Sequence, residues 1–257
     1  MTSSSVVAIV QARMTSARLP GKVLADLGGY PVLHWVTNRL SLAETVDNVI
    51  VATSTDPSDD PVAGWCAQAQ FQCFRGSLKD VLARFEGAAQ QTEARVIVRI
   101  TADCPLVDPE LVDLVVHELV NNNLDYCGLA GEFPDGLDCE AMTSAALKRA
   151  HREALLPSER EHVTPFLKRS GLGFRTGSVE PFVGLGHHRW TLDLPEDLAF
   201  LRAVVAHRTE EPSRLKTNDV IAIVNSYPEL SEINAGIVRN EGYIRSREED
   251  CAHDLQS

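Results

Sequence analysis

Short hydrophobic runs alternate with stretches of helical periodicity over the first half of the chain. The runs at residues 6–10 (VVAIV), 48–52 (NVIVA) and 95–100 (RVIVRI) predict buried parallel strands, because a strand covered on both faces is apolar throughout. Shorter strands are expected at residues 71–74 and 125–128. The helices expected between the strands are Pro31–Leu40, Val62–Gln70, Leu78–Phe85 and Pro109–Val120. This alternation predicts an α/β fold, in which an open and mostly parallel sheet carries helices on both faces.

After residue 128 the pattern becomes less regular. Residues 131–138 (GEFPDGLD) are rich in turn-forming residues. The elements expected beyond them are the helices Ser144–Leu155, Ser158–Lys168, Pro195–His207 and Lys216–Tyr227, and the strands Gly171–Val179 and His187–Leu192. We therefore expect one domain over residues 1–257, with an inserted arm at about residues 129–188 and a flexible tail from about residue 246.

The loop Val10–Lys22 (VQARMTSARLPGK) joins the first expected strand to the first expected helix. It carries three cations, Arg13, Arg18 and Lys22, together with hydroxyl groups such as that of Ser16. Ligands of open α/β sheets bind beyond the carboxyl ends of the strands, and basic side chains with hydroxyl groups suit a polyphosphate. A solvated basic loop is the alternative interpretation.

Composition narrows the classes of ligand. The net charge of −12 argues against a general nucleic-acid or anionic-membrane surface, so an anionic ligand must be met by a local cluster of cations. No apolar run approaches the roughly 18 residues of a membrane-spanning helix. The six cysteines lack CxxC and zinc-ligand spacing, which fits a cytoplasmic protein. The chain also lacks GxGxxG after the first strand and any GxxxxGK[ST], which argues against a Rossmann dinucleotide site and a P-loop.

Two aspartates stand where predicted strands end. Asp103 follows the strand at 95–100, and Asp193 follows the strand at 187–192. Two carboxylates beside a phosphate-binding loop could hold Mg²⁺, which prefers a few carboxylates together with substrate phosphates. The alternative for each aspartate is a turn or helix N-cap role, as expected for Ser77 before the helix at 78–85.

Further polar residues lie in the expected arm. Asp135 and Asp138 belong to a turn, and Arg160 and His162 belong to a short helix. A turn followed by a strand, and a solvated helical face, are the alternatives for these two stretches. In an arm beside a cleft, these side chains could reach a second substrate.

Four stretches together resemble the cytidylyltransferases that make CMP-activated acidic sugars, above all the spore-coat-polysaccharide type, a relative of the CMP-Kdo and CMP-sialate synthetases. They are residues 10–22, 75–85 (RGSLKDVLARF), 99–109 (RITADCPLVDP) and 189–198 (RWTLDLPEDL). The resemblance implies a Rossmann-like nucleotidyltransferase fold, similar to GT-A glycosyltransferases, built as a three-layer sandwich. It also implies CTP and Mg²⁺ as substrate and cofactor, a small acidic sugar-like acceptor, no nucleic-acid partner, and a homodimer formed through the arm.

The same resemblance assigns roles to residues. It places Arg13 and Lys22 on the phosphates, and Asp103 and Asp193 on the metal. The nucleotide would also meet Gln11, Ala12 and Ser77 near the base, and Ser16 and Arg18 in the loop. Arg18 is either a phosphate contact or an ion-pair partner. An acidic acceptor would need cations, for which Arg160, His162 and Arg189 are candidates. The sialate branch has Pro where this chain has Gln11 and Asn where it has Val23, so a sialic acid is not expected.

Three other functions stay open at this point. A GT-A glycosyltransferase would need a DxD motif, which is missing at residues 102–104 and 193–195. A nucleotidyltransferase acting on a sugar 1-phosphate or using another NTP would usually begin with a glycine-rich loop, whereas residues 14–17 (MTSA) lack glycine. A non-catalytic nucleotide-binding protein on the same fold is the third.

Overall fold

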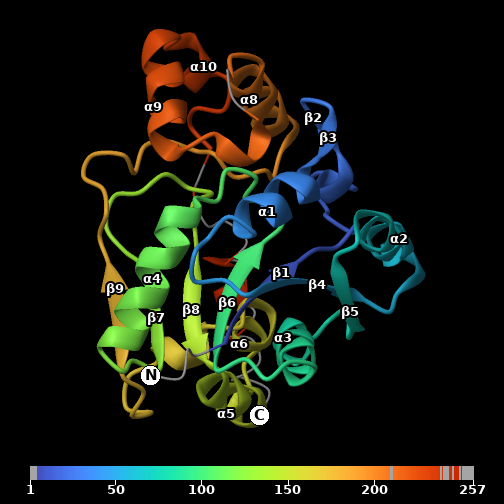
Figure 1. The fold of residues 1–257 in the computed structure, drawn as a ribbon, viewed down its shortest axis with the longest axis vertical. Coiled ribbons are helices and arrows are strands. Elements are labelled where there is room, and N and C mark those ends of the chain that lie inside the picture. The colour runs from blue at the N-terminus through green and yellow to red at the C-terminus, as the bar shows by residue number, and fades with distance from the viewer. Residues whose placement is uncertain are drawn as a thin grey trace.

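The computed structural model describes residues 5–208, 211–237, 239, 243–244, 246–248 and 250. Its centre is a seven-stranded sheet in the order β5–β4–β1–β6–β8–β7–β9 (Figure 1). Strand β8 is antiparallel to both neighbours, and the other neighbouring pairs are parallel. The strands are β1 Val6–Gln11, β4 Asn48–Ser54, β5 Gln72–Gly76, β6 Val96–Thr101, β7 Tyr126–Leu129, β8 Glu140–Thr143 and β9 Thr176–Val179. A hairpin of β2 Asp26–Leu27 and β3 Tyr30–Pro31 stands apart from this sheet.

Hydrophobic clusters on both faces of the sheet make a three-layer sandwich. In β1, Ala8 and Val10 belong to the cluster on one face, and Val7 and Ile9 belong to the cluster on the other. The first cluster includes residues of α1 Val32–Leu40, α2 Asp60–Ala69, α4 Pro109–Asn121, α8 Pro195–Ala206, α9 Thr217–Ser226 and α10 Glu229–Glu232. The second includes residues of α3 Val81–Gln90, α5 Ser144–Glu153 and α7 Pro165–Lys168, and α6 Pro157–His162 packs on α3. The helices α8, α9 and α10 lie beyond the carboxyl end of β6 (Figure 1).

The predicted α/β sandwich with a mostly parallel sheet is confirmed, and most predicted elements are present with shifted ends. The strand predicted at His187–Leu192 is wrong, since this segment forms only an isolated bridge between Asp135 and Arg189. Its backbone bonds to loops instead, because the Trp190 N–H donates to the Asp135 carbonyl. The predicted Ser77 cap is also wrong: α3 begins at Val81, and Asp80 is the N-cap.

The segment predicted as an inserted arm, residues 129–188, contributes β8 and β9 to the central sheet. Of the tail predicted from about residue 246, the structure describes residues 246–248 and 250, and the rest lies outside the described residues. Asp250 is buried, and its carboxylate accepts hydrogen bonds from the backbone N–H and hydroxyl of Ser158 in α6. Asp250 therefore satisfies a backbone N–H in the first turn of α6.

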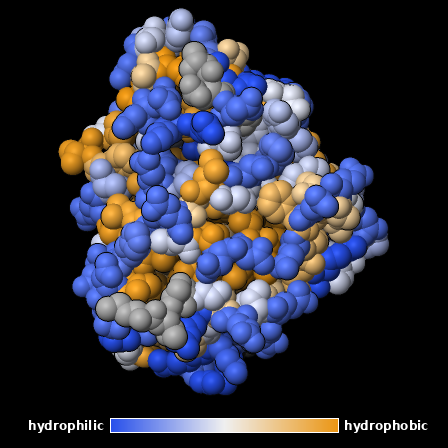
Figure 2. All heavy atoms as spheres, in the orientation of Figure 1, coloured by the Kyte–Doolittle hydropathy of each residue, from blue (hydrophilic) through white to orange (hydrophobic). Residues whose placement is uncertain are grey.

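Polar side chains cover most of the face shown in Figure 2, and apolar side chains gather near its middle. A groove of about 540 Å³ between α1 and α4 is lined partly by the exposed Leu42 and Leu114. None of the candidate residues named from the sequence lines it. Among the described helices, none has the length and apolar character needed to cross a bilayer.

Gly136 lets two loops approach each other closely behind the carboxyl edge of the sheet. Its φ is +103°, and a Cβ there would lie 2.4 Å from the Thr191 nitrogen and 2.5 Å from the Trp190 carbonyl carbon. Both atoms are backbone, so they cannot move aside without moving the segment that leads to Asp193. Gly136 therefore determines where that segment lies.

We predict that Gly136→Ala destabilises the protein and shifts the 189–193 segment. Gly184→Ala is the matched control, because Gly184 also has positive φ (+77°) but has nothing within 4 Å of its Cβ position. The control should cost about 1 kcal/mol for the backbone conformation alone, and Gly136→Ala should cost about 2 kcal/mol more for overpacking. Urea unfolding of both variants measures the difference; equal losses would show that the close approach is unimportant.

Candidate active site at the carboxyl edge of the sheet

The Lys22 ammonium joins three segments that are far apart in sequence. Its Nζ lies 2.8 Å from a carboxylate oxygen of Asp103, 2.8 Å from one of Asp193 and 2.8 Å from the Leu192 carbonyl oxygen. A lysine ammonium has three N–H donors, so protein atoms use all of them. Lys22 follows Gly21, whose φ of +75° allows the turn into the short 3₁₀ helix Lys22–Leu24.

Ionisation of this cluster follows from its geometry. Burial alone would favour the neutral acid, but the adjacent Lys22 ammonium lowers the pKa of Asp103 from 3.8 to about 2. Burial likewise opposes the charge of Lys22, yet Asp103 and Asp193 raise the pKa of its ammonium above the ordinary value. Both groups are therefore charged at neutral pH.

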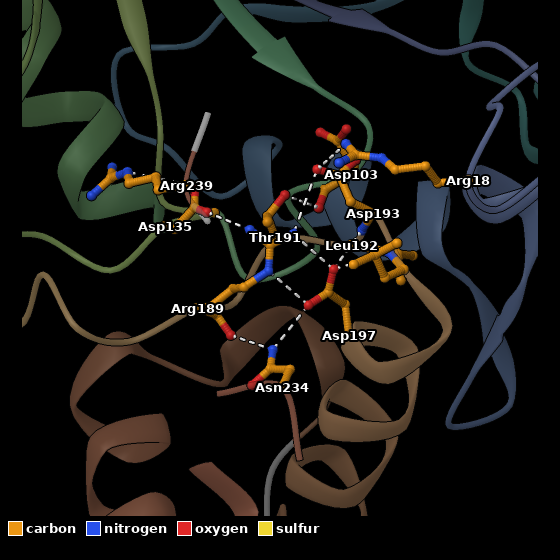
Figure 3. A network of polar contacts seen from close by, with 12 residues as sticks. Arg18, Asp103, Asp135, Arg189, Thr191, Leu192, Asp193, Asp197, Asn234 and Arg239 are labelled. Atoms are coloured by element: carbon orange, nitrogen blue, oxygen red, sulfur yellow. Dashed lines mark hydrogen bonds and ion pairs between the residues drawn. The ribbon is translucent and has the colours of Figure 1, made fainter. Parts of the chain in front are cut away.

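Arginine and aspartate side chains form a network of ion pairs and hydrogen bonds around Asp193 (Figure 3). The Arg189 guanidinium donates to both carboxylate oxygens of Asp197 at 2.9 Å, and its third arm donates to Asp135 at 2.9 Å. Asp197 is fully buried and also accepts the backbone N–H of Asp193. Arg18 completes the network from the loop side, with its Nη2 lying 2.9 Å from the second oxygen of Asp193.

The opening loop is anchored by a carboxylate that the sequence analysis did not single out. Asp59 is fully buried, accepts the backbone N–H of Met14 at 2.7 Å, and also binds the Ser54 hydroxyl. A hollow of about 710 Å³ adjoins this loop, lined by Met14, Thr15, Ser16, Ala17, Pro20, Gly21 and Ser58. The loop is therefore a fixed wall, held to the end of β4.

A second group of polar side chains belongs to α6. Arg160 forms an ion pair with Asp80 at the N-terminus of α3, and its Nη1 donates to the His151 carbonyl. The next residue, Glu161, lies 3.2 Å from the Arg13 guanidinium in the opening loop. Burial, with help from the nearby Arg99, lowers the pKa of His162 to about 4, so His162 is neutral at pH 7. Helix α6 thus connects the opening loop with the loop before α3.

Asp135 and Asp138 lie beside Arg239 on the other side of the network. The guanidinium of Arg239 is 3.7 Å from Asp135 and 3.6 Å from Asp138. Burial, together with the neighbouring charge of Asp138, raises the pKa of Asp135 to about 6 despite the two arginines. These carboxylates therefore form an acidic patch next to Arg189.

The structure brings together most residues predicted for the site. Lys22, Arg18, Asp103 and Asp193 meet directly, and Arg189 joins Asp135 to them. Arg13, Arg160 and His162 belong to the α6 group, Asp138 lies beside Arg239, and Ser16 lines the hollow beside the opening loop. Gln11 ends β1, Ala12 follows it, and Ser77 follows β5. The N-cap alternative does not apply to Asp103 or Asp193, since Asp108 caps α4 and Leu194 occupies the N-cap position of α8.

Asp59 and Asp197 are buried carboxylates of the candidate site that the sequence did not indicate. Asp197 stands three residues after Leu194, where an acidic residue reaching back to the N-cap is ordinary helix chemistry. Asp59 is one of several carboxylates in a turn-rich loop. Only their burial and their hydrogen-bond partners in the structure distinguish Asp59 and Asp197 from other carboxylates of the chain.

The donor set fits a magnesium ion carried with a nucleotide. In the described part of the chain, no cluster of three or more His, Cys, Asp or Glu side chains is arranged around one point. Mg²⁺ in nucleotide sites typically takes one or two carboxylates, and phosphates and water supply its other ligands. Asp103 and Asp193 already hold one cation between them, the Lys22 ammonium.

The fold is the Rossmann-like fold of solved nucleotidyltransferases. A cytidylyltransferase from Leptospira borgpetersenii superimposes with a TM-score of 0.85 and 28% identity, over 92% of this chain and all of that one. A CMP:2-keto-3-deoxy-manno-octonic acid synthetase solved with CTP shares the fold, with a TM-score of 0.61 and 20% identity over 79% of this chain and 99% of that one.

Sequence comparison gives the family. The cytidylyltransferase family model matches residues 7–226, and the chain belongs to this family. It is 34% identical to an uncharacterized protein of Methanocaldococcus jannaschii over 93% of this chain and 97% of the relative. It is 31% identical to the spore coat polysaccharide biosynthesis protein SpsF of Bacillus subtilis, over 89% and 97%. The protein is thus an enzyme, a CTP-dependent nucleotidyltransferase, and the glycosyltransferase and non-catalytic alternatives no longer apply.

We predict a specific acid dependence for the Asp103–Lys22 pair. The folded-state pKa of Asp103 is lowered from the ordinary value of 3.8. The stabilisation that the Asp103 carboxylate contributes is therefore complete above pH 3.8 and is lost as the pH falls toward 2. The contribution amounts to at most about 2 kcal/mol. The gap in unfolding free energy between wild type and Asp103→Asn should therefore narrow from pH 5 to pH 3, measured by urea unfolding in EDTA. A constant gap would contradict the ion pair.

Proposed function

We propose that the protein transfers CMP from CTP to a hydroxyl group of an acidic sugar or related acid, releases pyrophosphate, and depends on Mg²⁺. The carrying observation is the meeting of Lys22, Asp103 and Asp193 beside the opening loop. The relatives support an acidic sugar, because one partial match, 31% identical over 46% of each chain, is a 3-deoxy-manno-octulosonate cytidylyltransferase of Geobacter sulfurreducens. The name of SpsF adds polysaccharide biosynthesis as the setting.

In this proposal the opening loop binds the triphosphate. Arg13, whose side chain is 44% exposed, contacts the phosphates, and Ser16 lines the hollow beside it. Lys22 reaches the phosphates only by giving up at least one of its three protein acceptors, since all its donors are in use. Arg18 orients Asp193 by ion pairing, which is one of its two predicted roles. Gln11, Ala12 and Ser77 lie near the base.

The reaction needs positioning and charge neutralisation, without a covalent intermediate. The acceptor hydroxyl attacks the α-phosphorus in line, and pyrophosphate leaves. Arg13 and Lys22 offset the charge that develops on the leaving group. Asp103 and Asp193 would hold Mg²⁺, which when bound polarises a phosphoryl oxygen and orients the reactants.

The acceptor side is formed by the arm at 129–188 and its surroundings. Its cations are Arg189 and Arg160. His162 was predicted as a third cation, but its lowered pKa leaves it neutral at pH 7, so it offers only a polar contact. The carboxylates of Asp135 and Asp138 would bind hydroxyl groups of the acceptor. In the proposal the same arm forms a homodimer interface, and light scattering of the purified protein would give the mass of a dimer.

We predict that Asp103→Ala abolishes turnover without unfolding the protein. The substitution removes one of the two metal-holding carboxylates, and loss of a principal electrostatic contact to the transition state costs about 10²–10³-fold or more in rate. The assay is Mg²⁺-dependent pyrophosphate release from CTP in the presence of an accepted sugar. Asp60→Ala, which removes an exposed carboxylate, is the control. Full activity of Asp103→Ala would reject the metal assignment.

The base and the acceptor are tested together by offering all four NTPs with a panel of 2-keto acid sugars. We expect pyrophosphate release with CTP and at least one acidic sugar, and little release when a neutral sugar replaces it. Preference for UTP or GTP would refute cytidylyl transfer, whereas CTP turnover with neutral sugars alone would refute only the acidic acceptor.

A further inference from the structure

Arg84 is a buried guanidinium without an ion-pair partner among the described residues. It lies in α3 and is 1% exposed. Its Nη1 donates to two backbone carbonyls, those of Ser77 and, at 2.9 Å, Leu78. Its Nε is buried and has no hydrogen-bond partner in the described part of the chain. Burial lowers the pKa of this side chain, as expected for a charge removed from water.

A buried charge held by carbonyls alone is unfavourable, and an apolar side chain of similar size would fill the position at lower cost. What the arginine provides is a fixed path for the loop that joins β5 to α3. The end of β5, where the loop begins, fits closely over it, since a Cβ on Gly76 would lie 3.0 Å from the Arg84 Cγ. On the far side, the loop is fixed by Asp80, whose backbone N–H donates to the Ser77 hydroxyl and whose carboxylate pairs with Arg160.

The two carbonyl contacts determine where the next backbone donors point. In a planar trans peptide the N–H points opposite to the carbonyl of the same unit, and no cis peptide is found in the described chain. The N–H groups of Leu78 and Lys79 are therefore turned away from Arg84. No described residue accepts a hydrogen bond from either. Two consecutive backbone donors thus stand together on this loop.

The loop stands at the edge of the sheet where the nucleotide would bind. It follows the carboxyl end of β5, which neighbours β4, and β4 neighbours β1 with its opening loop. Arg84 is close enough to Arg13 and Glu161 for their charges to affect its ionisation. The paired donors therefore lie on the same edge as the candidate phosphate-binding residues.

We propose that Arg84 positions the Leu78 and Lys79 N–H groups to read the cytosine of CTP. Cytosine presents adjacent acceptors, N3 and O2, which match two adjacent donors, whereas uracil carries a hydrogen on N3 that would oppose one of them. Arg84 is thus a positioning residue for base selectivity, acting through the loop without touching the nucleotide. The inference rests on the proposed placement of the nucleotide and extends it to a specific reading of the base.

The test is calorimetric binding of CTP, UTP and pyrophosphate, each with Mg²⁺, to wild type and variants. We expect Arg84→Met to weaken CTP binding about tenfold, the effect of two misaligned hydrogen bonds, while UTP and pyrophosphate binding stay unchanged. Arg84→Lys, which keeps a carbonyl-binding donor, should recover part of the loss. Arg152→Met is the control, since that side chain is 67% exposed on α5.

A purely structural role for Arg84 would weaken all three ligands together, and that result overturns the proposal. An unchanged ratio of CTP to UTP affinity in Arg84→Met overturns it as well. Lys79→Pro provides a second measurement if Arg84→Met does not fold, because proline removes one of the two N–H groups while Arg84 stays in place; it should lower CTP affinity selectively, and equal loss of pyrophosphate affinity would count against the proposal. Wild type that binds CTP and UTP equally would overturn the cytidylyl reading itself.

Discussion

The ammonium of Lys22 is the interaction on which the architecture of the site depends. It closes contacts over 81 residues to Asp103 and over 170 and 171 residues to Leu192 and Asp193. Without the Lys22 ammonium between them, the carboxylates of Asp103 and Asp193 would repel each other and separate. The turn at Gly21 and the end of β6 are both placed so that the ammonium reaches its acceptors. One side chain, that of Lys22, thus fixes the opening loop relative to the end of β6 and to the segment before α8.

The network of ion pairs and hydrogen bonds around Asp193 stabilises the contact between Asp193 and Lys22. A carboxylate held only by an exposed lysine would gain little, because solvent weakens surface ion pairs. Here Arg189 is bound by Asp197 and Asp135, and Asn234 donates to both the Arg189 carbonyl and Asp197. Buried ion pairs repay their desolvation only when the remaining donors and acceptors are also satisfied. The fully buried Asp197 meets that condition with three kinds of partner.

The fold could be predicted from the sequence because its central strands are apolar on both faces and its helices show clear periodicity. The segment at 187–192 has strand-like composition, but its backbone partners are loops from distant parts of the chain, which local patterns do not encode. Lys22, Asp103 and Asp193 were singled out by their positions in the loop and after predicted strands, and the family resemblance assigned their roles. Their direct contact was not predicted, since no local rule relates positions so far apart. Asp197 looked like an ordinary helix-start residue, and Arg84 like one more amphipathic helix position.

In the proposed reaction, the ion pairs of the site also bear on how a phosphate ligand reaches its cations. Asp103 and Asp193 share the Lys22 ammonium, and Arg18 also pairs with Asp193, so the charges of these four side chains balance. These two cations, which could contact a phosphate, are therefore already occupied by carboxylates. In the proposed reaction, a magnesium ion carried by the nucleotide would give Asp103 and Asp193 another cation. Lys22 would then be free to contact the phosphates, because its carboxylate partners would have gained another partner.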